Sequence, residues 1–176
     1  LLESLTSLKA SPMMDALALS GLQAAGPALP RAVEHGSDVD ARSAMAYASF
    51  LSGVTLSHAG LRVVHGLASP LGALFSIPHS VICARLLPFV TTANLKALKA
   101  GRGFAQARSA YQEAEGALGQ DLHSFCARFS FPPLSSFGVT GADIPRVVKG
   151  ATGGSMKTNP VELTNEELQD ILHRAL

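Results

Sequence analysis

Charge is scarce in this sequence. Only 15% of its 176 residues are charged, against roughly a quarter in an average soluble domain. The formal net charge is +1 and there is no basic run, so the composition offers no electrostatic attraction for nucleic acid or an anionic membrane. We expect neither as a partner. Hydrophobic residues reach 47%, more than one small core needs, so we expect a partner domain or a homo-oligomer.

Cysteine is almost absent, and so are long apolar runs. Cys83 and Cys126 have neither metal-site nor redox spacing, so we expect two buried thiols and a cytoplasmic protein. No uninterrupted apolar run approaches the ~18 residues of a membrane span. The start at Leu1 lacks the basic flank and apolar core of a signal peptide, and it lacks Met. We therefore expect Leu1 not to be the native start.

Helical patterns dominate what is present. No strand-like alternation lasts long enough to predict a strand, so the chain is predicted to be an all-α, multi-helix bundle. The helix that begins at Ser11-Pro12 is expected to end near residue 26, at a Gly-Pro pair. Pro and Gly residues are also expected to break the chain at 69–72. The helix at 39–59 is apolar on all faces and is expected to be central. Further helices are predicted at 78–90, 105–118, 121–129 and 165–173.

One segment contains two residues suited to metal binding. Residues 65–79 read HGLASPLGALFSIPH, with His65 and His79 fourteen residues apart around a turn of small residues. Imidazole is the commonest metal ligand in proteins, and two imidazoles on such a segment can converge on one ion. Taken alone, the pair has a commoner explanation, because most histidines at this spacing are hydrogen-bonded core residues.

The same segment resembles the metal-binding signature of the iron-containing alcohol dehydrogenases, His-Gly-x-x-His-Pro-Leu-Gly followed by Pro-His-Gly. Other stretches are similar to this family in the same order along the chain. They are SPMMDALAL at 11–19, ALPRAV at 28–33, AGL at 59–61, LLP at 86–88 and NP at 159–160. The resemblance therefore covers residues 1–176.

The resemblance implies a fold like the helical C-terminal domain of the dehydroquinate synthase-like, iron-dependent alcohol dehydrogenases. Residues 1–176 would form the metal- and substrate-binding domain of an NAD(P)-dependent enzyme that interconverts an alcohol and its aldehyde or ketone. The N-terminal nucleotide-binding α/β domain would be absent from this chain, and Gly153-Gly154-Ser155 is interpreted as a turn, not a phosphate loop. The expected cofactors are a divalent metal, Fe²⁺ or Zn²⁺, and NAD or NADP.

The resemblance also implies roles for individual residues. His65 and His79 are the expected metal ligands, and the family's remaining Asp and His ligands would lie just upstream of Leu1. Asp15 is rejected as a ligand because the stretch before it matches the family's next helix. Ser69 replaces a family histidine that points into the substrate cleft, so it is either a cleft residue or a plain helix stop. Residues that bind the nicotinamide cofactor are not assigned.

Two other functions stay open. A maleylacetate reductase-like oxidoreductase would share the fold and the histidines without a tightly bound metal. A non-catalytic helical interaction domain would share only the fold. On the dehydrogenase interpretation, this chain alone is predicted to be inactive, because it lacks the nucleotide-binding half and two metal ligands.

Overall fold

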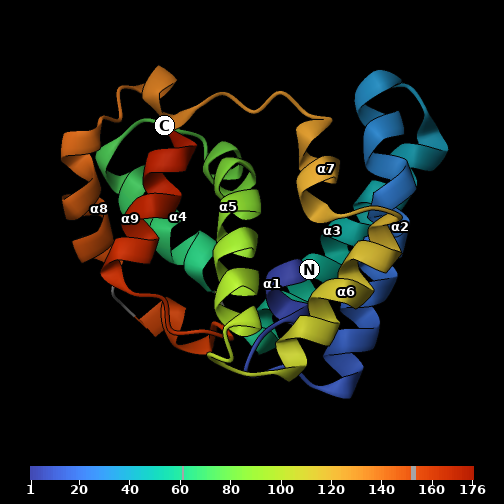
Figure 1. The fold of residues 1–176 in the computed structure, drawn as a ribbon. Helices are drawn as coiled ribbons and strands as arrows, with labels where there is room; N and C mark the ends of the chain where they lie inside the picture. The colour runs from blue at the N-terminus through green and yellow to red at the C-terminus, as the bar shows by residue number, and fades with distance from the viewer. Residues whose placement is uncertain (61, 152–153) are drawn as a thin grey trace. The chain divides into compact units, whose positions relative to one another are not determined.

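The computed structural model describes residues 1–60, 62–151 and 154–176 (Figure 1). Helices make up the regular structure of these residues and no strand occurs among them, which confirms the all-α prediction. The α-helices are α1 Leu2–Leu5, α2 Pro12–Glu34, α3 Val39–Ala59, α4 Val63–Leu74, α5 His79–Lys99, α6 Gln106–Leu118, α7 Leu122–Ala127, α8 Ile144–Ala151 and α9 Asn165–Ala175. The short 3₁₀ helices are η1 Leu134–Phe137, η2 Gly141–Asp143 and η3 Gly154–Thr158.

The chain divides into two compact units, and neither unit is one continuous stretch. The first unit consists of residues 1–60 and 106–128, and the second consists of the described residues of 61–105 and 129–176. The backbone therefore passes from one unit to the other three times. We describe each unit separately.

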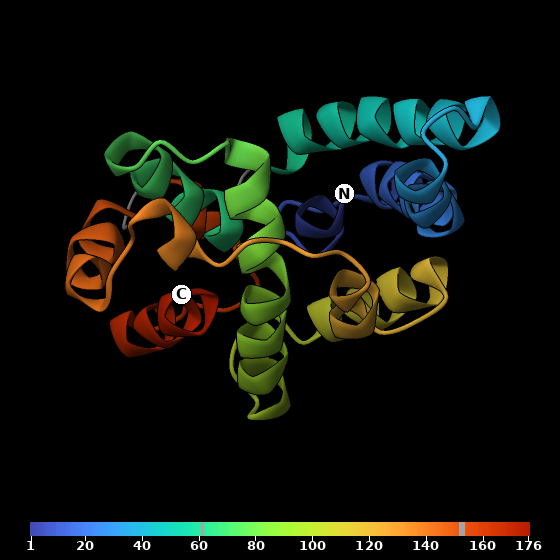
Figure 2. The same ribbon diagram turned by 90° about the horizontal axis from the view of Figure 1, so that it is seen from above.

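The first unit is built on the hairpin of α2 and α3, which pack along one another (Figure 2). The predicted end of α2 near Gly26-Pro27 is wrong, because the helix runs through Pro27 and Pro30 to Glu34. A helix-interior proline costs about 3 kcal/mol in isolation, so packing must hold α2 together. Gly26 shows that packing, because an added Cβ would lie 3.1 Å from the carbonyl oxygen of Ala117 on α6.

The predicted bounds of α3 are confirmed, but its predicted central position is wrong. Its buried residues form a single stripe that includes Ala48 and Leu51, whereas Val39 is 71% exposed and Phe50 is 68% exposed. Small alanine side chains let α2 approach one face closely, and the remaining apolar residues are left at the surface. They are available to the partner domain or subunit that we expect from the composition, and that expectation stays a prediction.

The second unit holds the larger core. Helix α4 packs on α5 and α8, and α9 packs on α5 and α8. The core includes Leu67 of α4, Ile82 and Leu86 of α5, Val147 of α8 and Ile171 of α9, all at most 1% exposed.

Proline residues lie inside helices in this unit as well, and do not end them. Pro70 lies inside α4 and is buried, and a Cβ added to Gly150 of α8 would lie 3.0 Å from it. Pro88 lies inside α5, which continues to Lys99 instead of ending near residue 90. Both prolines occupy helices that bury several residues in the core, so burial compensates for the missing hydrogen bonds.

Among the described residues, α5 is the one helix long and apolar enough to cross a membrane by length and composition alone. The helix contains no long uninterrupted apolar run, because charged residues such as Arg85 interrupt it without much lowering its mean hydropathy. In the structure Ile82, Leu86 and Val90 of α5 are buried in the core of the second unit. The buried side of α5 is thus part of the core of this unit.

A polar connection ties α5 to the segment before α9. The buried amides of Asn94 and Asn159 bond to each other, with Asn159 Nδ2 donating to Asn94 Oδ1 at 2.8 Å. Close by in sequence, the Phe104 N–H donates to the carbonyl oxygen of Pro160 at 2.8 Å. At its start, α9 carries a capping box, in which Thr164 and Glu167 bond reciprocally.

We predict that Gly103→Ala destabilises the protein more than Gly101→Ala. Both glycines have positive φ, at 78° and 77°, so alanine at either position costs about 1–2 kcal/mol in backbone strain. An added Cβ on Gly103 would also collide with the carbonyl oxygen of Pro160, whereas the space around Gly101 is open. We expect Gly103→Ala to cost at least about 1 kcal/mol more in the free energy of unfolding, measured by chemical denaturation. Equal losses would contradict the close approach of Gly103 to Pro160.

Candidate metal centre

His65 and His79 come from two helices joined by a short connection. His65 is the third residue of α4, and His79 is the first residue of α5. The helix that carries His65 is separate from α3, which ends at Ala59 and is followed by Gly60 with φ +76°. The chain between α4 and α5 turns at residues 75–78, where the Ile77 N–H bonds to the Phe75 carbonyl and Pro78 precedes the first residue of α5.

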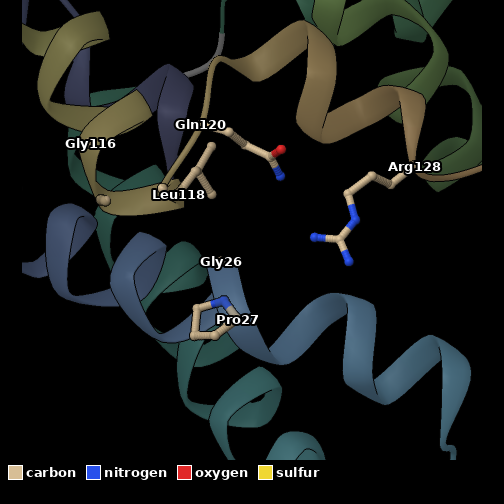
Figure 3. A pocket seen from close by; sticks show the side chains of 8 residues that line it. Gly26, Pro27, Gly116, Leu118, Gln120 and Arg128 are labelled. Atoms are coloured by element: carbon tan, nitrogen blue, oxygen red, sulfur yellow. The ribbon is translucent and has the colours of Figure 1, made fainter.

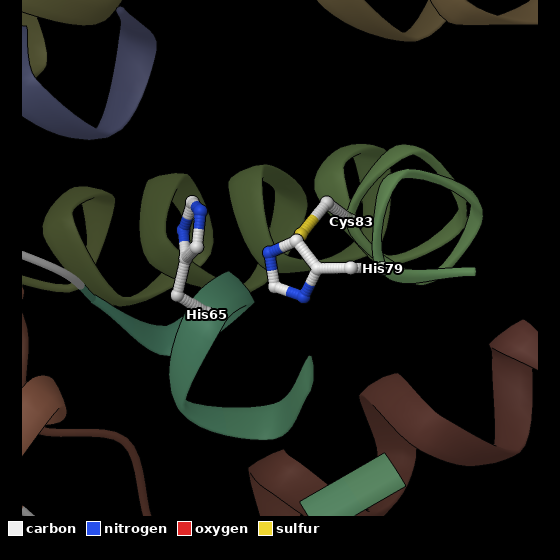
Figure 4. Close-up of side chains that lie close together, drawn as sticks. All are labelled: His65, His79 and Cys83. Atoms are coloured by element: carbon white, nitrogen blue, oxygen red, sulfur yellow. The ribbon is translucent and has the colours of Figure 1, made fainter. Parts of the chain in front are cut away.

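The turn brings the two imidazole rings together, as predicted from the sequence (Figure 4). Their centroids are 5.4 Å apart and their planes are inclined at 45°. His65 is partly buried and His79 is exposed, so the pair is open to solvent on one side. Two ring nitrogens placed this way can bind one ion from solution.

Cys83 is part of the same cluster, which the sequence analysis missed. Its Sγ lies 3.4 Å from Nε2 of His79, and the ligand-type atoms of His65, His79 and Cys83 all lie within 4.8 Å of one another. The expectation that Cys83 is a buried thiol is wrong, because its side chain is only partly buried. The available signal was the spacing of four residues between His79 and Cys83, which places both on one face of a helix.

Ser69 lies one helical turn after His65 on α4 and is exposed. The spacing of four residues puts it on the same face of the helix as His65. The alternative that Ser69-Pro70 is a plain helix stop is wrong, because α4 continues to Leu74. Of the predicted turn at residues 153–155, Gly153 lies outside the described residues, and Gly154 opens the 3₁₀ helix η3.

Asp15 belongs to the first unit and lies in the first turn of α2. Burial raises the pKa of this carboxyl above its ordinary value, and the nearby charge of Glu113 raises it further. The first unit also has a pocket of about 410 Å³, lined in part by Gly26, Pro27 and Arg128 (Figure 3). None of the predicted site residues lines this pocket.

The fold and the paired histidines define an all-α domain with a candidate centre for a divalent metal. Residues 1–176 match the Fe-containing alcohol dehydrogenase family, C-terminal domain. The chain therefore belongs to the Fe-containing alcohol dehydrogenase family, and the resemblance found in the sequence is confirmed.

Individual relatives agree with this assignment. Alcohol dehydrogenase 4 of Saccharomyces cerevisiae is 32% identical over 179 residues, which cover 99% of this chain and 47% of the relative. The crystal structure of a 1,3-propanediol oxidoreductase superposes with a TM-score of 0.81 at 30% identity, covering 98% of this chain and 48% of that one. A maleylacetate reductase from Agrobacterium tumefaciens superposes with a TM-score of 0.84 at 26% identity, covering 99% and 48%. The chain thus spans about half the length of these relatives.

We predict that the Cys126 thiol reacts slowly with alkylating reagents near neutral pH. Burial raises the pKa of Cys126 to about 11, so at pH 8 roughly one in a thousand of these side chains is a thiolate. Alkylation of Cys126, followed by mass spectrometry in the Cys83→Ser variant, should be slow at pH 8. Its rate should rise about tenfold per pH unit as the pH approaches 11. Alkylation at pH 8 as fast as that of a free small-molecule thiol would contradict the prediction.

Proposed function

We propose that residues 1–176 are the metal- and substrate-binding domain of an NAD(P)-dependent, metal-dependent alcohol dehydrogenase that interconverts an alcohol and its aldehyde or ketone. The observation that carries the proposal is the convergence of His65 and His79, with ring centroids 5.4 Å apart, in a chain that matches the family from end to end. The relatives named above act on alcohols or related carbonyl compounds, as their names state.

The donor set fits a divalent cation. Imidazole nitrogens bind Fe²⁺ and Zn²⁺ alike, so His65 and His79 leave that choice open. The family's remaining two ligands, an Asp and a His, are proposed to come from the protein upstream of Leu1. When bound, the cation supplies Lewis-acid polarisation of the alcohol or carbonyl oxygen, while NAD or NADP exchanges the hydride.

Ser69 is proposed to face the substrate. Its exposed hydroxyl, one turn from His65, can donate one hydrogen bond and accept others. It cannot relay protons at neutral pH as an imidazole does, because imidazole is the side chain whose ordinary pKa lies near neutrality. Ser69 therefore orients the substrate oxygen, and the proton is exchanged through another group.

A maleylacetate reductase-like activity is the second candidate, supported by the structural similarity to such an enzyme and by the serine at position 69. Metal analysis of the full-length protein separates the two. About one equivalent of divalent metal per chain supports the alcohol dehydrogenase, and turnover without metal supports the alternative. A non-catalytic domain would show neither metal nor turnover.

Replacing either predicted ligand should weaken metal binding. We expect His65→Ala and His79→Ala, made in the full-length protein, to raise the Kd for Zn²⁺ at least roughly tenfold, which is about 1.4 kcal/mol. Competition with a chromophoric chelator measures this Kd. His123→Ala is the matched control, because His123 is exposed on α7 in the first unit. Unchanged affinity in both ligand variants would refute the assignment.

The chain on its own should not turn over. Residues 1–176, expressed alone and supplied with Zn²⁺ or Fe²⁺, are expected to show no NAD(P)-dependent oxidation of alcohols, because the family resemblance places the hydride carrier's domain outside this chain. The full-length protein should show it under the same conditions. The measurement is the absorbance of the reduced nicotinamide. Turnover by residues 1–176 alone would contradict the proposal that the nicotinamide-binding domain lies outside this chain.

A further inference from the structure

We propose that Cys83 is a third ligand of the cation held by His65 and His79, and that its sulfur biases the centre toward a thiophilic divalent metal such as zinc. The inference rests on the proposed role of the two histidines as ligands, and it is independent of the alcohol dehydrogenase reaction. It is carried by the cluster of the three side chains, whose ligand-type atoms all lie within 4.8 Å of one another.

The distances suit a shared ion. Together with the Asp and His proposed to lie upstream of Leu1, Cys83 would be a fifth protein ligand. With zinc bonds of about 2.0–2.1 Å to nitrogen and 2.3 Å to sulfur, neighbouring N and S ligands of one ion lie about 3.1–3.6 Å apart, and neighbouring N ligands about 2.9–3.4 Å apart. The separation of Cys83 Sγ from His79 Nε2 is 3.4 Å, which lies within that range. The other two separations are at most 4.8 Å, so they need to close by about 2 Å or less, which side-chain rotation allows.

The local structure supplies rigidity where the ligands attach and access where the ion enters. His79 and Cys83 lie one turn apart on α5, while Ile82 and Leu86 of the same helix are fully buried in the core. His65 is fixed on α4, where Val64 and Leu67 are buried. Cys83 and His65 are partly buried and His79 is exposed, so solvent reaches the cluster.

The sulfur changes which metal is preferred. Thiolate ligands favour zinc over harder ions, whereas a set of imidazole and carboxylate ligands accommodates Fe²⁺ as readily. Coordination requires the thiolate, so binding of the cation displaces the Cys83 proton, which is released to solvent as the metal–sulfur bond forms. No electrons are transferred in this step.

The test uses Co²⁺ as a spectroscopic substitute for Zn²⁺ in the full-length protein after removal of bound metal. A cobalt–thiolate bond gives a charge-transfer band in the near ultraviolet, and cobalt bound by nitrogen and oxygen alone does not. We expect this band in the unmodified protein and in Cys126→Ser, the matched control for the other cysteine. Cys83→Ser should lose the band, still show visible absorption from bound cobalt and bind Zn²⁺ at least roughly tenfold more weakly.

A second measurement needs no variant. Zn²⁺ should protect Cys83 of the unmodified protein from alkylation and should leave the rate at Cys126 unchanged. Cobalt binding without the band, a band that survives Cys83→Ser, or a Cys83 that zinc does not protect would each overturn the inference while leaving His65 and His79 as ligands. A double variant lacking both histidines that keeps the original cobalt spectrum would overturn the proposed metal site itself.

Discussion

The packing of α4 against α5 is the constraint on which the candidate centre depends. Leu67 and Leu71 of α4 and Ile82 and Leu86 of α5 have no exposed surface, and these contacts fix the two helices that carry the cluster. Burying side chains of this size contributes about 1.5–3 kcal/mol each before entropy is counted. The histidines themselves contribute little to the core. They are held close together because the apolar faces of their helices leave the connecting turn little freedom.

The same packing explains which parts of the fold were predictable. Helix starts with a side-chain cap were readable from local residues, as at Ser11, Asp38 and Thr164. Helix ends predicted from proline were not, because Pro27 and Pro70 lie inside helices. A proline breaks a helix when nothing else holds it, and here neighbouring helices do. The prediction that α3 is central failed for a related reason. The apolar character of α3, averaged over all of its faces, does not show that its buried contacts are made mainly by alanines on one face.

The site was predictable to the extent that it follows from a linear motif. His65 and His79 were found from their spacing and from the family resemblance, and the structure brings them together. The sequence did not predict Cys83 as part of the cluster, because its separation from Cys126 fits no metal-binding or redox motif. The informative comparison was between Cys83 and a histidine one turn away, and it required knowing that α5 begins at His79. The environment of Ser69 also needed the structure, since only the unbroken helix through Pro70 puts it on the face of His65.

Because the backbone passes between the two units three times, each unit can be completed only after residues from two separate parts of the chain have been synthesised. The first unit closes only when residues 106–128 join residues 1–60, and the second closes only when residues 129–176 join its earlier half. During synthesis, the half of the second unit that carries His65, His79 and Cys83 therefore leaves the ribosome well before α8 and α9, which complete its core. The order of translation exposes the cluster before its supporting helices exist. A divalent ion or a folding helper that arrives at that stage meets these three side chains before the core has closed.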